Sequence, residues 1–188
     1  MAQPSGFPFT TIEPPIFQTE VVVKTTESER VTFIAENGKK RRVEFDPGGS
    51  RSRVLIYSDK TYLLDIKDRT FVEYPLAGGL SVADDPFRSL LIGGKPYAEF
   101  VKLGSENGID KFSVRLDDSG LSEALIYVDT QLGLPVKQEF YSISADGRTL
   151  QYSVELRNIR LEADESLFRI PDGFRRVGSI ENDPGKGR

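Results

Sequence analysis

The stretch from residue 17 to residue 25 reads FQTEVVVKT, and its pattern sets the fold class. Phe17, Thr19, Val21 and Val23 alternate with the residues between them. A period of two is what a β-strand imposes, because successive side chains point to opposite faces. Valine and threonine are also β-branched and favour strands. We therefore predict a long strand here.

The same alternation returns along most of the chain, in short segments separated by polar turns. Asn37-Gly38 and Asn107-Gly108 are the two-residue turn signal of a β-hairpin. Tight turns between short strands favour pairing of sequential neighbours. Counting the first stretch, we expect about ten or eleven strands in an antiparallel sheet. The other strands cover residues 30–35, 40–45, 53–57, 62–66, 71–74, 98–103, 109–116, 122–129, 134–143 and 149–161.

One segment breaks the strand pattern. Asp84 and Asp85 precede Pro86, and two glycines close the segment at residues 93 and 94. An acidic N-cap, a proline at the first helical position and a terminal glycine are typical of a helix. Leu90 and Leu91 follow Phe87 at i+3 and i+4, which gives the helix one apolar face toward the sheet. We expect one or two short helices in all.

These elements predict a mainly β fold. A large antiparallel sheet twists and curls, so we expect a half-barrel with the short helices on its concave side. It would span residues 16–177. Residues 1–15 contain Pro8, Pro14 and Pro15 and predict an extended arm, while residues 178–188 are polar and predict a disordered tail.

Composition removes several kinds of chemistry. The chain of 188 residues has no cysteine and no histidine. This removes thiolate nucleophiles and thiolate metal sites, together with the commonest metal ligand and general base. Its net charge of −4 argues against a nucleic-acid partner, whose phosphates call for a cationic surface. No apolar run reaches the length of a transmembrane helix. We predict no cofactor, no metal site and no enzymatic activity.

The C-terminal half carries a string of motifs. Ile126-Tyr127-Val128-Asp129 precedes Gly133-Leu134-Pro135, and Phe168-Arg169-Ile170-Pro171-Asp172-Gly173-Phe174 closes the domain. The hairpin from Tyr62 to Pro75 adds a further match. In order and spacing these motifs resemble the LolA/LolB-like superfamily of periplasmic outer-membrane lipoprotein carriers. The chain departs from those carriers in having a proline-rich arm where they have a long amphipathic N-terminal helix.

The resemblance implies an incomplete barrel in the periplasm, or otherwise exported, whose concave apolar groove binds acyl chains or other amphipathic ligands. Export implies a signal peptide that is already removed. Partners would be a lipid, a lipoprotein acyl chain or an envelope protein. The large apolar strand and helix positions are the candidate groove residues: Val21, Val23, Phe33, Phe45, Leu55, Tyr57, Leu63, Phe71, Leu90, Leu91, Phe100, Phe112 and Tyr127. The contrasting interpretation is that they pack as a filled core.

Two different functions remain compatible with the sequence. The same fold also supports a protein-interaction or sensor module of the envelope. An enzyme would have to use aspartate, glutamate, tyrosine or lysine in the groove.

The basic run Lys39 to Arg42 beside a turn is either a contact for anionic groups or a solvated turn. Asp84-Asp85 and Asp117-Asp118 stand where caps and turns favour aspartate.

Overall fold

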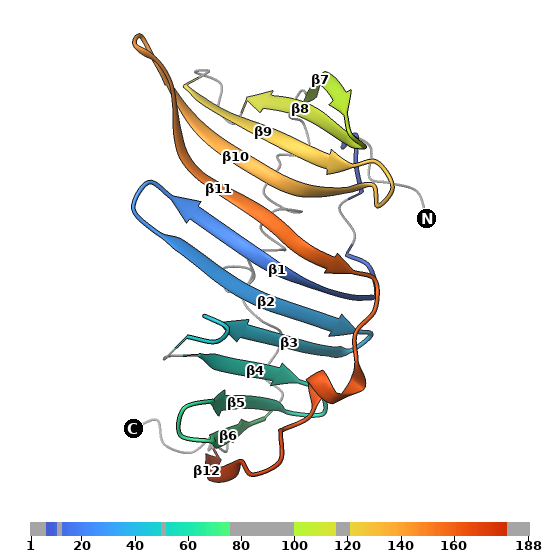
Figure 1. Ribbon diagram of the computed structural model, residues 1–188, viewed down its shortest axis with the longest axis vertical. Helices are drawn as coiled ribbons and strands as arrows, with labels where there is room; N and C mark the ends of the chain where they lie inside the picture. The colour runs from blue at the N-terminus through green and yellow to red at the C-terminus, as the bar shows by residue number, and fades with distance from the viewer. Residues whose placement is uncertain (1–6, 11–12, 50–51, 76–99, 116–120, 180–188) are drawn as a thin grey trace, which may run out of the picture. The chain divides into compact units, whose positions relative to one another are not determined.

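The computed structural model describes residues 7–10, 13–49, 52–75, 100–115 and 121–179. Nearly all of their regular structure is β-strand (Figure 1). The strands are β1 (Ile16–Thr25), β2 (Glu29–Asn37), β3 (Lys40–Phe45), β4 (Arg53–Tyr57), β5 (Thr61–Asp65), β6 (Thr70–Tyr74), β7 (Phe100–Glu106), β8 (Ile109–Arg115), β9 (Ser122–Asp129), β10 (Leu134–Ser144), β11 (Gly147–Arg160) and β12 (Arg175–Ser179).

The twelve strands hydrogen-bond in one open sheet in the order β12-β6-β5-β4-β3-β2-β1-β11-β10-β9-β8-β7. β12 and β7 are its two ends, so the sheet is not closed into a barrel. The mainly β fold is therefore confirmed, with slightly more strands than predicted. The predicted helix at residues 84–94 and the Asp117-Asp118 pair lie outside the described residues.

The expectation of a wholly antiparallel sheet is wrong at one place, because β12 pairs with β6 in parallel. The chain reaches β12 through a turn in which the Phe174 N–H donates to the Pro171 carbonyl. Glu73 on β6 then forms ion pairs with Lys60 and with Arg176 of β12. These contacts hold a strand whose partner lies about a hundred positions back along the chain.

By compactness the chain divides into two units, and each is described by itself. Unit 1 comprises residues 1–13, 21–30 and 80–157, and unit 2 comprises residues 14–20, 31–79 and 158–188. Unit 1 contains the β7–β10 meander and most of β11, and unit 2 contains the β3–β6 meander and β12. The described residues include no helix long and apolar enough to cross a membrane.

Unit 2 has an apolar core on one face of its meander. Val54, Ile56 and Leu64 are fully buried there. Phe168 completes this cluster from a short 3-10 helix, η2 (Glu165–Phe168), which is the one helix among the described residues. η2 follows Asp164, whose carboxylate accepts from the Ser166 N–H as an N-cap.

Three of the four residues of the basic run at the β2–β3 hairpin form ion pairs within unit 2. The Lys40 Nζ lies 2.5 Å from Glu165 Oε2 of η2. Arg41 forms an ion pair with Glu36, and Arg42 pairs with Glu44 at 2.7 Å. The run therefore ties the turn to its neighbours.

The turn itself consists of Gly38 and Lys39, because Asn37 still pairs with Lys40. The predicted Asn37-Gly38 turn is therefore displaced by one residue.

The unit 2 core predicts a large response to truncation. Ile56→Ala should lower the free energy of unfolding by about 2–5 kcal/mol, because it leaves a cavity at a site with no exposed surface. The exposed Val177→Ala serves as the control and should change it by about 0.5 kcal/mol or less. Urea unfolding followed by far-ultraviolet circular dichroism measures both. A cost below about 1 kcal/mol for Ile56→Ala would contradict this packing.

Candidate functional site

The apolar face of unit 1 is formed by alternate residues of β8 and β9. Phe112 lies opposite Ile126, and Val114 lies opposite Ala124, in the antiparallel register. Directly opposed residues share a face of the sheet. All four are buried, and Val128 extends the cluster along β9. Phe100 of β7 and Phe140 of β10 pack against it from either side.

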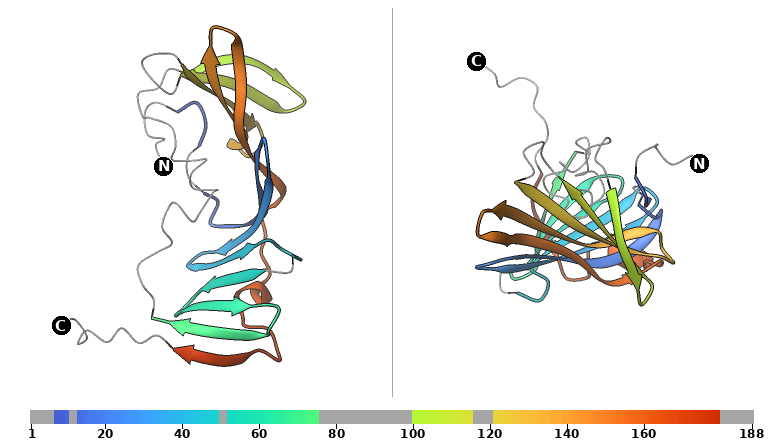
Figure 2. Two further views of the ribbon diagram at one scale, coloured as in Figure 1. Left: turned by 90° about the vertical axis from the view of Figure 1, so that its left-hand side faces the viewer. Right: turned by 90° about the horizontal axis from the view of Figure 1, so that it is seen from above.

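The N-terminal arm covers this face. Phe9 is only 4% exposed, although it belongs to no strand. Its ring centroid lies 5.6 Å from that of Phe100, in an edge-on arrangement, and 6.3 Å from that of Phe112. Phe7 lies 5.5 Å from Phe100 and 5.8 Å from Phe9. Figure 2 shows the described segment of residues 7–10 beside the strands rather than within the sheet. The rings of Phe7, Phe9, Phe100 and Phe112 therefore pack together on this face. The sequence leaves open whether such a face forms an open groove or a filled core.

The turn between β9 and β10 anchors the arm. The Thr10 N–H donates to the Gly133 carbonyl at 2.9 Å. Gly133 has a φ of 66°, which a side chain disfavours. The Asp129 carboxylate accepts from the N–H groups of Gln131 and Leu132 and fixes the same turn. The Gly-Leu-Pro motif therefore positions the arm as well as starting β10.

The opposite face of the same strands is mainly polar, although Leu125 is buried on it. Tyr127 is flanked in register by Lys111 of β8 and Lys137 of β10. Both ammonium groups lie 5.1 Å from the centroid of its ring, which is within the range of a cation–π attraction. Nearby, the Arg148 guanidinium stacks 3.7 Å from the Tyr141 ring centroid.

Glu139 is the centre of this face. Its Oε2 accepts hydrogen bonds from the hydroxyls of Tyr127 at 2.8 Å and Tyr141 at 2.9 Å. Its Oε1 lies 2.6 Å from the Lys137 Nζ. Burial alone would raise the pKa of Glu139, but the bonds from Lys137 and the two tyrosines outweigh it, so the pKa is lowered. We call Tyr127, Lys137, Glu139 and Tyr141 the tyrosine–glutamate network.

This network is poorly suited to acid–base chemistry. Burial and the bond to Glu139 raise the pKa of the Tyr127 hydroxyl, so it holds its proton more firmly. A general base works best with a pKa near the operating pH, whereas the pKa of Glu139 moves away from neutrality. Within the ranges that the structure describes, no three acidic residues converge as a metal site would require. The arrangement stabilises a surface rather than activating a group.

The predicted groove residues do not share one face. Phe100 and Phe112 lie under the arm, whereas Tyr127 is on the polar face of the same strands. In unit 2, Phe33 and Phe71 pack against the Phe168 cluster. Leu90 and Leu91 lie outside the described residues. The remaining predicted positions are buried or partly buried along their strands: Val21, Val23, Phe45, Leu55, Tyr57 and Leu63.

Sequence reasoning missed the part that Phe7 and Phe9 play. The signal was present, since two aromatics on either side of a proline are unusual in a solvated arm. Their destination depends on the turn at Gly133, more than a hundred residues away. Glu139, Lys137 and Tyr141 were missed as well, because an alternating polar residue on a strand gives no sign of its partners.

Comparison with known proteins addresses the fold. No protein-family model and no characterised sequence matches the chain. Among solved structures, MucB of Pseudomonas aeruginosa, in its complex with MucA, aligns with a TM-score of 0.52 and 15% identity, over 83% of this chain and 56% of MucB. The chain therefore spans little more than half of that relative.

Two further structures align over most of both chains. An uncharacterised conserved protein from Thermus thermophilus has 14% identity over 88% of this chain and 91% of its own, with a TM-score of 0.49. A LolA superfamily protein from Nitrosomonas europaea has 14% identity over 84% and 91%, with a TM-score of 0.34. Of these structures, MucB has a TM-score above 0.5, and at 15% identity this likeness concerns the fold alone. The chain has a LolA-like fold. The resemblance of the C-terminal motifs is thereby confirmed at the level of the fold.

The tyrosine–glutamate network predicts a pH dependence of stability. A lowered pKa in the folded state means that Glu139 contributes stability above its ordinary pKa of 4.5 and loses it as the pH falls through the lowered value. Glu139→Gln should remove this contribution. The difference in unfolding free energy between wild type and variant should therefore shrink from about pH 6 to about pH 3.

Hydroxyl-deletion variants test the cause. Tyr127→Phe and Tyr141→Phe should each reduce the pH dependence, because each removes a donor to Glu139. Tyr152→Phe is the matched control, since its ring stacks on Phe140 instead. Urea unfolding at several pH values gives the comparison. Equal profiles for all three variants would show that the tyrosines do not set the pKa of Glu139.

Proposed function

We propose that the chain is a non-catalytic binding domain of the cell envelope. In this proposal unit 1 takes an acyl chain or another amphipathic ligand on the apolar face that the arm covers. The observation that carries the proposal is the burial of Phe9 on that face. Phe9 belongs to a segment outside the sheet. A ligand that takes the place of this segment therefore breaks no pairing between strands.

The chemistry of the face supports an apolar ligand. Phe112, Ile126 and Val128 offer rings and methyl groups and no charge. An acyl chain that displaced Phe7 and Phe9 would keep the face covered, because burial of methylene groups stabilises by about 0.8 kcal/mol each. Lys102 lies at the edge, with its Nζ 5.9 Å from the Phe112 ring centroid. Its charge is already balanced by Asp110 at 2.7 Å, so in this proposal the apolar part of the ligand carries the binding.

A protein partner is the second candidate. MucB has been crystallised with MucA, which shows that a protein with this fold engages another protein. At 15% identity the likeness extends to the fold alone. In this second candidate function, an apolar segment of an envelope protein would take the place of Phe7 and Phe9.

Removing the arm's side chains tests the proposal. Full-length protein carrying Phe7→Ser and Phe9→Ser should bind the fluorescent fatty acid cis-parinaric acid about tenfold more tightly than wild type, because the competing occupant is lost. Pro8→Ser is the matched control, since Pro8 is exposed and lies between the two rings. Fluorescence titration measures the affinities, and far-ultraviolet circular dichroism verifies folding.

Two results would count against the acyl-binding proposal. One is the absence of binding in both the wild type and the double variant. The other is an equal gain in the Pro8→Ser control. Retention of one envelope protein by the immobilised double variant, without fatty-acid binding, would favour the protein partner.

A further inference from the structure

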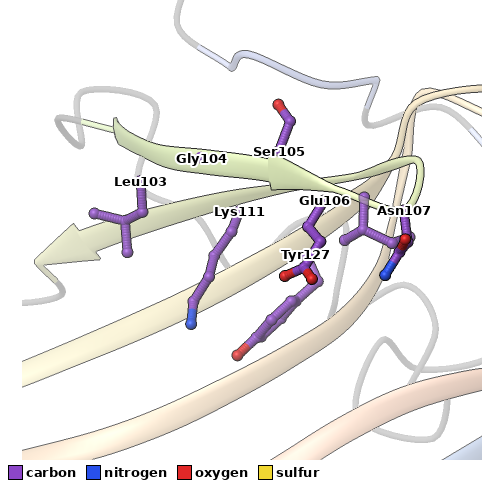
Figure 3. Close-up of a pocket in the computed structure, with 8 residues that line it drawn as sticks. Leu103, Gly104, Ser105, Glu106, Asn107, Lys111 and Tyr127 are labelled. Carbon is purple, nitrogen blue, oxygen red and sulfur yellow. The ribbon is translucent and has the colours of Figure 1, made fainter.

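A cleft lies on the polar face of unit 1, away from the arm. The hairpin of β7 and β8 and the neighbouring strand β9 line an open cleft of about 490 Å³ (Figure 3). Leu103 and Ile109 line it with apolar surface, and Tyr127 lines it with its ring. Its volume falls in the range of small-molecule sites. It is built from described strands and shares none of the buried residues under the arm.

A register shift in β7 opens the cleft. Lys102 pairs with Phe112 and Gly104 pairs with Lys111, so Leu103 is left without a partner position on β8. A bulge of this kind re-aims a side chain. Leu103 is 53% exposed and faces the cleft (Figure 3). Gly104, opposite Lys111, contributes no side chain, which leaves space above the lysine.

The cleft contains one positive and one negative group, and neither has an ionic partner among the described residues. Lys111 has its ammonium over the Tyr127 ring and forms no ion pair with any residue in the described ranges. Glu106 lines the cleft as well and likewise forms no ion pair with a residue in those ranges. By contrast, Lys102 of the same hairpin pairs with Asp110 at 2.7 Å.

We propose that this cleft binds a zwitterionic amphiphile, with the anionic group on Lys111, the ammonium on Glu106 and the apolar part against Leu103 and Ile109. A single anion would meet the repulsion of Glu106, and a single cation would meet that of Lys111. A head group that carries both charges satisfies both residues. Phosphoethanolamine has this pattern, either as a lipid head group or as the free compound. The proposal concerns a different face from the arm-covered site and does not depend on it.

The test is an NMR titration of the full chain, following the backbone amides of residues 103–111 and 127. The first probe is dihexanoyl phosphatidylethanolamine below its critical micelle concentration. It should give saturable shifts confined to these amides. Dihexanoyl phosphatidylglycerol lacks the ammonium, and free phosphoethanolamine lacks the acyl chains. Each should bind about tenfold more weakly than the first probe.

Three variants make the assignment specific. Lys111→Gln and Glu106→Gln should each weaken binding of the phosphatidylethanolamine probe about tenfold, through loss of one charged contact. Lys102→Gln is the matched control on the same hairpin and should leave the affinity unchanged. The side chains of Lys111, Glu106 and Lys102 are all at least partly exposed. Leu103 is also exposed, and Leu103→Ser tests the apolar wall of the cleft.

Four results would overturn the proposal or one of its parts. Free phosphoethanolamine binding as tightly as the lipid would overturn the amphiphile and leave a small-molecule zwitterion site. Equal affinities for the ethanolamine and glycerol lipids would overturn the zwitterion. Shifts that appear only around Phe112 and Ile126 would overturn this cleft and support the arm-covered face instead. Chemical shift changes that persist unchanged in Lys111→Gln and Glu106→Gln would overturn the assignment of the two charged contacts.

Discussion

The structure depends on the need to cover an apolar sheet face in a chain with very little helix among its described residues. Alternation along the strands gives each unit a dry face. In unit 1 that face is closed by Phe9 of the arm, and in unit 2 by Phe168 of η2. Both residues are about 95% buried, and neither belongs to a strand. Because burial of apolar surface is the main favourable term in folding, these two short segments stabilise the faces that they cover.

Many of the lysine and arginine side chains near the sheet form an ion pair with a neighbouring carboxylate. Lys40 and Arg42 of the basic run pair with Glu165 and Glu44. On the polar face of unit 1, Glu139 collects two tyrosines and a lysine. Glu139 and Tyr127 are poorly suited to acid–base catalysis, because the pKa of Glu139 is lowered and the pKa of Tyr127 is raised. Against this background, a lysine and a glutamate that share one cleft and have no ion-pair partner in the described ranges point to recognition of a ligand.

Much of the fold was predictable from the sequence because strand periodicity and turn residues are local. β3, β4 and β9 have the predicted bounds, and Asn107 and Gly108 both adopt the positive φ that their hairpin turn needs. The parallel β12–β6 pair was not predictable, since it joins distant segments. The candidate site was harder still. A register shift between Phe140 and Tyr141 changes which residues share a face, and a pattern of alternation alone does not report it.

Both edges of the sheet are irregular in a way that disfavours the addition of another strand. An edge strand exposes unpaired N–H and C=O groups and invites another strand. Here each edge strand carries a register shift, which leaves Leu103 without a partner position in β7 and Val177 without one in β12. A bulge interrupts the regular row of hydrogen-bonding groups that an added strand would need. The irregularity that protects β7 also creates the cleft beside Lys111. At that edge, protection from strand addition and the formation of a ligand cleft arise from the same extra residue.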